Sequence, residues 1–158
     1  MIPEPLPMWL QTQTTRLHNA GLFSSPSHQI NHVLVNEYLP GQGIMSHVDG
    51  PLFSPLIATL NLGSGCTLNF KTRDPDTDSL VDQFSLFLEE GSLLVQSGEV
   101  YENYLHGIEE VDEDVIGQEV ANLHHCPWLN VGDTVRRDTR ISLTIRNVPK
   151  VSKFQLRL

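Results

Sequence analysis

Three side chains of types that commonly bind transition metals stand at two places in this 158-residue chain. His47 and Asp49 are separated by one residue, and His106 lies in an apolar segment that we expect to be a strand. Residues i and i+2 of a strand point to the same side with Cα atoms about 7 Å apart, so both side chains can reach one ion. A set of two histidines and one carboxylate leaves three adjacent positions of an octahedral ferrous ion open.

Each of these residues has a second interpretation. A His-x-Asp pair often occurs by chance, and a histidine in an apolar strand can simply donate to a backbone carbonyl. The adjacent residues His124, His125 and Cys126 raise the question of another metal site. They stand in an irregular segment without a spaced partner pair, and we do not expect them to converge on one ion.

The segment from Arg140 to Arg146 adds two cations to one face of a predicted strand. Alternation places the apolar side chains on one face and the polar ones on the other, which holds Arg140, Ser142, Thr144 and Arg146. Burying two arginines is costly unless they meet carboxylates, which guanidinium binds through a two-point fork. The pattern favours a bound dicarboxylate, although a solvent-facing strand side is the alternative.

A further strand is predicted over residues 32–38. Asn36 and Tyr38 share one of its faces with Leu34, so an amide and a phenol could supply additional hydrogen bonds. Considered alone, both are also ordinary strand residues.

The elements that must position these residues are short, β-rich runs separated by turn-forming clusters. We expect strands at residues 32–38, 44–48, 56–62, 67–71, 84–88, 92–96, 103–108 and 139–148. One short helix is predicted at 7–19, where Pro7 suits a first turn and Gly21 a stop. About eight strands behind one helix predict a mainly β sandwich or jelly roll. Residues 109–138 lack a clear period and are expected to form a long, exposed insertion.

Four motifs follow one another in order: NEYLPG at 36–41, His47-x-Asp49, HGI at 106–108 and RISLTIR at 140–146. This ordered set resembles the AlkB family of dioxygenases. The stretches NHVLVNEYLPGQGIMSHVDGP at 31–51, NLGS at 61–64 and RISLTIRNVPKV at 140–151 are most similar to its alkylation-repair homologue six branch. The resemblance covers roughly residues 1 to 150.

The resemblance implies a double-stranded β-helix that uses Fe(II), 2-oxoglutarate and O₂. His47, Asp49 and His106 would ligate the iron. Arg140 would hold the distal carboxylate of 2-oxoglutarate with help from Tyr38, while Arg146 and Asn36 would border its metal-proximal end. Family chemistry converts 2-oxoglutarate to succinate and hydroxylates an alkyl carbon, often an N-methyl group of a nucleobase in alkylated RNA or DNA. The cofactor carries the difficult chemistry, and the protein orients the substrate.

Two features depart from the family pattern. Many members have Asn where this chain has Ser142, so one co-substrate contact would be shorter or lost. The nucleotide-recognition lid is normally encoded before the His-x-Asp strand, and only 46 residues precede His47 here. We therefore expect residues 1–158 to form a single dioxygenase domain that lacks part of the N-terminal nucleotide-recognition region.

The amino-acid composition limits the kinds of partner and compartment that this chain suits. Ten basic and nineteen acidic residues give a net charge of −9, which disfavours a broad phosphate-binding surface without excluding one. The acidic segment 109–119 is most simply a solvated loop, and a protein partner is the alternative. No run of about 20 apolar residues predicts a membrane span. Two cysteines without a signal peptide favour a reducing compartment, so we expect an intracellular protein of the nucleus and cytoplasm.

These patterns leave several functions open. The first is oxidative demethylation of alkylated nucleic acid, and the second is oxygenation of a protein side chain or small metabolite. A third is a catalytically silent relative that binds partners. Such a protein would have no physical need for the clustered metal ligands and arginines, which argues against it. A jelly-roll zinc hydrolase would leave the paired arginines unexplained.

Overall fold

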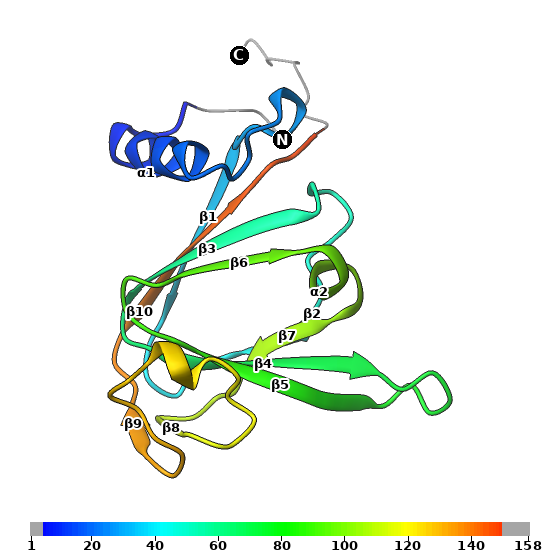
Figure 1. Ribbon diagram of the computed structural model, residues 1–158, viewed down its shortest axis with the longest axis vertical. Helices are drawn as coiled ribbons and strands as arrows, with labels where there is room; N and C mark the ends of the chain where they lie inside the picture. The colour runs from blue at the N-terminus through cyan, green and yellow to red at the C-terminus, as the bar shows by residue number, and fades with distance from the viewer. Residues whose placement is uncertain (1–4, 150–158) are drawn as a thin grey trace, which may run out of the picture.

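The computed structural model describes residues 5–149 and consists of two four-stranded antiparallel sheets with smaller elements around them (Figure 1). In chain order the elements are α1 (Met8–Asn19), the 3-10 turn η1 (Pro26–His28), β1 (His32–Tyr38), β2 (Ile44–His47), β3 (Leu56–Gly63), β4 (Cys66–Arg73), β5 (Leu80–Leu88), β6 (Leu93–Ser97), α2 (Gly98–Asn103), β7 (Leu105–Ile108), β8 (Glu113–Val115), the 3-10 turn η2 (Leu123–His125), β9 (Thr134–Arg136) and β10 (Arg140–Arg146).

The first sheet has the strand order β1-β10-β3-β6 and the second has the order β2-β7-β4-β5. The chain therefore passes between sheets several times, as in a jelly roll, and non-consecutive strands become neighbours. This confirms the predicted mainly β class with one N-terminal helix. All eight strands of the two sheets begin or end within a few residues of the predicted ranges.

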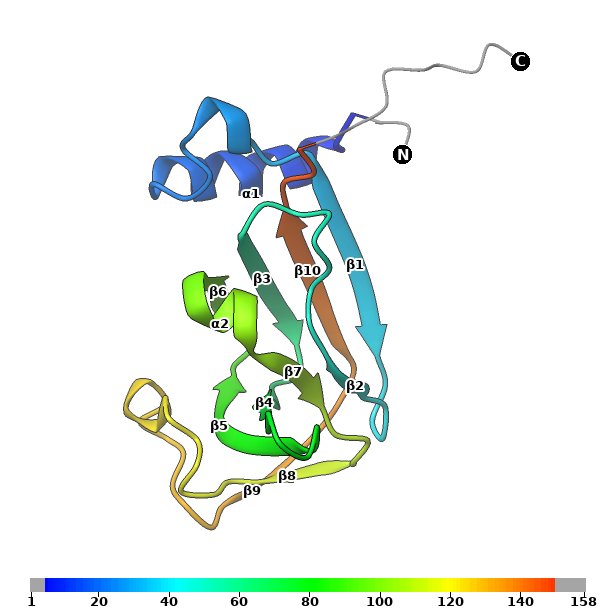
Figure 2. The ribbon, with the colours of Figure 1, turned by 90° about the vertical axis from the view of Figure 1, so that its right-hand side faces the viewer.

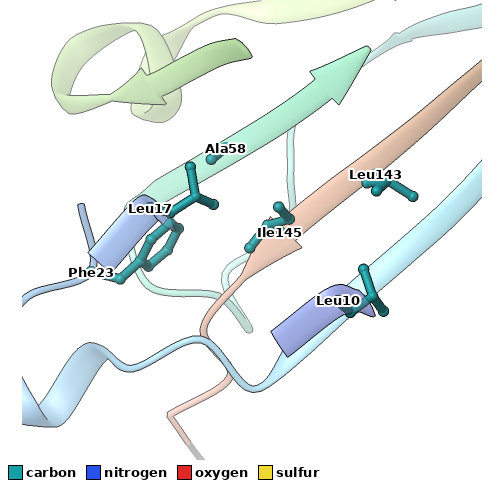
Figure 3. Packing of buried hydrophobic residues seen from close by; sticks show 6 residues of the cluster. All are labelled: Leu10, Leu17, Phe23, Ala58, Leu143 and Ile145. Carbon is teal, nitrogen blue, oxygen red and sulfur yellow. The ribbon is translucent and has the colours of Figure 1, made fainter. Parts of the chain in front are cut away.

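Helix α1 covers the outer face of the first sheet, where Leu10 and Leu17 pack against Leu143 and Ile145 of β10 (Figure 3). The helix begins after Pro7, whose ring fixes a suitable φ, and it ends before Gly21 at φ +87°. The apolar stripe of α1 therefore covers the outward face of β10, and the opposite face of that strand points into the interior between the sheets.

A second apolar cluster fills the space between the sheets. Cys66, Leu68 and Phe70 of β4 pack there with Leu88 and Ile108. Cys66 is 2% exposed and serves as a small core residue. This cluster closes one end of the interior and leaves the other end for the polar residues of β1, β2, β7 and β10.

The insertion at 109–138 differs from the predicted exposed loop. It contains the two-stranded β8–β9 sheet, and Ile116, Val120, Cys126 and Leu129 bury themselves against Phe87 on the outer face of the second sheet. In Figure 2, β8 and β9 lie below the strands β4 and β5, and the yellow part of the segment lies to their left. Because these apolar residues lie in irregular backbone, no helical or strand periodicity in the sequence predicts their burial.

The acidic segment is likewise not wholly solvated. Asp114 and Arg137 are both buried and form a two-point ion pair, with Nε–Oδ2 and Nη2–Oδ1 distances of 2.7 Å. Arg137 also donates through Nη1 to the Glu109 carbonyl at 2.6 Å. The remaining acidic side chains of this segment are exposed to solvent. The buried ion pair therefore stabilises the interior of the insertion, and the other carboxylates lie on its surface.

One further difference concerns local structure. Residues Gly98–Asn103 form the short helix α2, so Asn103 is not part of the predicted strand at 103–108. Within residues 5–149, none of the helices is both long and apolar enough to span a bilayer.

Candidate metal and co-substrate site

The structure brings all eight predicted site residues to one cavity between the two sheets, with a volume of about 120 Å³. They come from β1, β2 and the turn after it, β7 and β10, and they are Asn36, Tyr38, His47, Asp49, His106, Arg140, Ser142 and Arg146. Strand pairing explains the arrangement, because β1 and β10 are directly paired with Tyr38 opposite Arg140 and Asn36 opposite Ser142.

The two histidines are cross-strand neighbours. His47 on β2 is paired with His106 on β7, and their ring centroids are 4.6 Å apart. The predicted strand 44–48 ends one residue earlier, at His47, so Asp49 lies just beyond β2. Its carboxylate still turns inward, with Oδ2 3.5 Å from Nε2 of His106.

Gly107 allows β2 and β7 to approach this closely. A Cβ at this position would lie 2.8 Å from the backbone nitrogen of Ser46 and 2.9 Å from the Ile44 carbonyl oxygen. A side chain would therefore push β2 away from β7 and separate the histidines. Close packing of β2 against β7 therefore explains why the residue after His106 in the HGI motif is a glycine.

Burial, followed by the charge of His47, lowers the pKa of His106 to about 4, against the opposing effect of Asp49. At neutral pH the His106 imidazole is therefore uncharged, and its 3.5 Å contact with Asp49 is not an ion pair. Neutral imidazole is the form that ligates metals. Nδ1 of His106 lies 3.4 Å from the Gln96 amide, which leaves Nε2 directed toward Asp49 and the cavity.

The carboxylate of Asp49 also meets a cation. Nη1 of Arg146 donates to its Oδ1 at 3.0 Å, and both side chains are about nine-tenths buried. Burial lowers the pKa of Arg146, while Asp49 opposes that shift. In residues 5–149 no three His, Cys, Asp or Glu side chains are already converged as a metal cluster. The donors are adjacent but are held by other partners, since His47 Nδ1 also lies 2.8 Å from the Met45 carbonyl oxygen.

Arg140 lies at the other side of the cavity and is 5% exposed. It donates through Nη2 to Oδ1 of Asn61 at 2.5 Å, and its guanidinium carbon is 5.4 Å from the centre of the Tyr38 ring. Its Nε is buried without a hydrogen-bond partner in the described residues. Burial raises the pKa of Tyr38, so its phenol remains protonated and able to donate.

The residues present fit a ferrous ion with a dicarboxylate beside it. Two imidazoles and one carboxylate are the donor types of a facial triad, and they leave room for other ligands. The buried guanidinium of Arg140, with an unused Nε and no carboxylate within ion-pair distance in residues 5–149, fits an anionic ligand.

Sequence reasoning missed three neighbours of these groups. Gln96 contacts His106, Asn61 contacts Arg140, and the Phe53 ring lies 4.0 Å from the Arg146 guanidinium carbon. Only Asn61 stood in a motif that we had singled out. The residues His124, His125 and Cys126 lie outside this cavity: His124 and His125 are exposed, with tilted rings whose centroids are 3.9 Å apart, whereas Cys126 is buried.

Comparisons with known proteins agree with this geometry. Residues 2–146 match the family model described as the 2OG-Fe(II) oxygenase superfamily. The chain is 42% identical over 163 residues to the protein named probable RNA/DNA demethylase ALKBH6 of Danio rerio, covering 99% of this chain and 68% of that protein. It is 35% identical over 128 residues to the tRNA (carboxymethyluridine(34)-5-O)-methyltransferase alkbh8 of Xenopus tropicalis, covering 77% of this chain but 19% of that protein.

A solved structure, described as the structure of OsALKBH1, superimposes with a TM-score of 0.53 at 18% identity. The match covers 92% of this chain and 67% of that one, and at this identity it supports the fold alone. The family model matches nearly the whole described chain and the Danio rerio relative is 42% identical to it, so this chain belongs to the 2OG-Fe(II) oxygenase superfamily, among its AlkB homologues.

Proposed function

We propose that this chain is an oxidative demethylase of alkylated nucleic acid in which His47, Asp49 and His106 hold ferrous iron. Family membership makes the chain a dioxygenase with Fe(II) as cofactor and 2-oxoglutarate and O₂ as co-substrates. The observation that carries the assignment of the residues is their convergence on one cavity from four separate parts of the chain.

When bound, the iron with 2-oxoglutarate and O₂ supplies an oxidant that hydroxylates a C–H bond, with succinate and CO₂ as the other products. The chain's own residues prepare the site for this chemistry. His106 stays unprotonated at neutral pH because of its burial, and Asp49 is kept near it by the cross-strand pairing of β2 and β7. Arg146 holds the Asp49 carboxylate from the opposite sheet.

On the co-substrate side, we propose that Arg140 binds the distal carboxylate of 2-oxoglutarate and that Tyr38 donates to it. Asn36 and Ser142 lie opposite each other between the two arginines and supply polar contacts along the ligand. Apolar side chains such as Ile44, Leu68 and Ile108 line the remaining wall. They exclude water, which strengthens charge–charge contacts inside the cavity.

Metal binding tests the ligand assignment directly. We would titrate the protein with Mn(II) under anaerobic conditions and follow the binding by calorimetry. The substitutions His47→Ala, Asp49→Ala and His106→Ala should each remove detectable binding, whereas His28→Ala, which removes an exposed histidine of η1, should bind as the parent does. Undiminished binding by a folded His106→Ala protein would exclude that residue as a ligand.

The substrate class rests on the name of the Danio rerio relative, an RNA/DNA demethylase, and on its 42% identity. Oxidation of an N-methyl group releases formaldehyde, so N-methylated oligonucleotides should yield formaldehyde in step with succinate. Binding of these oligonucleotides should weaken steeply with salt if phosphate contacts matter. Formaldehyde from a methylated peptide, with none from oligonucleotides, would instead support the protein-oxygenase alternative.

We also propose that residues 1–158 act as one catalytic domain, since both sheets contribute to the same cavity.

The buried free thiols of Cys66 and Cys126 support a reducing compartment such as the nucleus and cytoplasm. The exposed carboxylates of segment 109–119 are available to a basic protein partner, and pull-down with and without charge reversal of Glu109 and Glu110 would test that contact.

A further inference from the structure

Asn61 on β3 is a fully buried polar residue, at 0% exposure, that does not line the cavity in the described part of the chain. It is paired with Ser142 across the β3–β10 ladder, so the two side chains lie on the same face of the sheet and Asn61 stands beside the row of predicted co-substrate residues. A buried amide is retained only where its hydrogen bonds are satisfied. The hydrogen-bond partners of the Asn61 amide explain why a polar residue is buried at this position.

The orientation of the Asn61 amide is fixed by its neighbours. Its Nδ2 faces the Ser92 carbonyl oxygen at 3.3 Å, the Ser92 hydroxyl at 3.2 Å and the Thr59 carbonyl oxygen at 3.4 Å. Ser92 is itself held, because its hydroxyl donates to the Glu89 carbonyl at 2.7 Å. With the donor end of the amide facing two carbonyl oxygens, Oδ1 must point the other way, where it accepts from Nη2 of Arg140 at 2.5 Å.

Arg140 differs from the other buried arginines in the described residues. Arg137 is paired with the carboxylate of Asp114, and Arg146 is paired with that of Asp49. Among residues 5–149, Arg140 meets only a neutral amide oxygen and the face of the Tyr38 ring. Its orientation is therefore fixed while its positive charge stays uncompensated.

We propose that Asn61 is the positioning residue of the co-substrate site: it orients Arg140 through a neutral acceptor and so keeps the guanidinium charge free for the distal carboxylate of 2-oxoglutarate. This inference rests on the proposed role of Arg140. A carboxylate at position 61 would accept the same hydrogen bond but would neutralise Arg140 and repel the incoming anion. The identity Asn, rather than Asp, is thus part of the binding site's charge balance.

The test compares two ligands on the Mn(II)-loaded, anaerobic protein by calorimetry. 2-Oxoglutarate and 2-oxopentanoate share the 2-oxo acid end, but only the first has a distal carboxylate. The parent should bind 2-oxoglutarate more tightly. In Asn61→Asp the affinity for 2-oxoglutarate should fall by at least about tenfold, because a charge-assisted contact is lost, while the affinity for 2-oxopentanoate changes by less than about twofold.

Asn69→Asp is the matched control. Asn69 on β4 accepts from the Ser85 hydroxyl at 2.7 Å, a bond that a carboxylate also accepts, and no arginine is involved. It should bind both ligands as the parent does. A merely structural role for Asn61 would lower the melting temperature and weaken both ligands together, which would overturn the inference.

If Asn61→Asp does not fold, Asn61→Ala decides the matter with the same two ligands. It removes the acceptor without adding charge, so 2-oxoglutarate should still weaken selectively, by roughly threefold to tenfold. Unchanged selectivity in a folded variant would contradict the role of Asn61 alone. A parent protein that does not distinguish the two ligands would instead contradict the proposed role of Arg140 and, with it, this inference.

Discussion

Arg146 and Asp49 are 97 residues apart in the sequence, yet Nη1 of the arginine donates to Oδ1 of the aspartate at 3.0 Å. The arginine comes from β10 in the first sheet, and the aspartate follows β2 in the second. The contact therefore joins the two sheets at the predicted metal end of the cavity. It also means that the carboxylate of the His-x-Asp motif already has a positive partner.

Replacing Arg146 by Met should destabilise the metal-free protein by roughly 3 kcal/mol, because the buried Asp49 carboxylate loses its counter-charge. A bound cation would supply that charge again. Saturating Mn(II) should therefore raise the melting temperature more in Arg146→Met than in the parent, as measured by thermal unfolding. Arg146→Lys, which keeps the charge, should respond as the parent does. An equal metal-dependent increase in the Met variant would show that Asp49 does not face the metal.

Gly107→Ala tests whether the close approach of β2 and β7 sets the distance between the histidines. The added Cβ would lie 2.8 Å from the Ser46 nitrogen, so β2 must shift. We expect a weaker Mn(II) affinity, by roughly tenfold, and a loss of about 1–3 kcal/mol in stability. Gly50→Ala is the control, since its Cβ would meet open space near the same site. Equal effects of the two substitutions in the Mn(II) titration would refute the explanation.

The ion pair between Asp114 and Arg137 should be important for the insertion. Arg137→Met leaves a buried carboxylate without its partner and should lower the free energy of unfolding in urea by roughly 3–5 kcal/mol. The double variant Asp114→Leu with Arg137→Met should recover part of that loss. Lys71→Met breaks the pair with Asp82, whose side chain is 82% exposed, and should cost less than about 1 kcal/mol. Comparable losses from Arg137→Met and Lys71→Met would argue against a structural role for the buried pair.

Both thiols should be unreactive in the native protein. Burial, then the nearby Glu89 carboxylate, raises the pKa of Cys126 to about 11, and burial raises that of Cys66 as well. A raised pKa favours the thiol over the thiolate, so at pH 8 about one Cys126 in a thousand would be ionised. A thiol-specific disulfide reagent at pH 8 should therefore react only after unfolding in guanidinium, and then with both cysteines. A rapid reaction in the native state would contradict their burial.

The convergence of these residues on one cavity was predictable because they follow the period of a strand. On β10 every second residue from Arg140 to Arg146 faces the cavity, and β1 repeats the pattern with Asn36 and Tyr38. The outward residues Leu143 and Ile145 follow the same alternation and meet α1. Two-residue spacing in the sequence therefore carried over directly to the two faces of each strand.

The insertion was not predictable in the same way. Its buried residues, such as Ile116 and Leu129, are spaced irregularly because the backbone that carries them is irregular, and Asp114 meets Arg137 only through the fold. Helix α2 has six residues, too few for a helical period to emerge. The role of Asn61 depends on contacts with Ser92 and Arg140, which are 31 and 79 residues away.

The most direct test of the central claim is succinate formation from 2-oxoglutarate by the purified chain, loaded with Fe(II) without oxygen and then exposed to O₂. We predict succinate that requires iron, is absent in His47→Ala and persists in His28→Ala. Equal succinate from the His47→Ala protein would contradict the ligand assignment. A folded parent that neither forms succinate nor binds Fe(II) and 2-oxoglutarate would contradict the proposed enzyme itself.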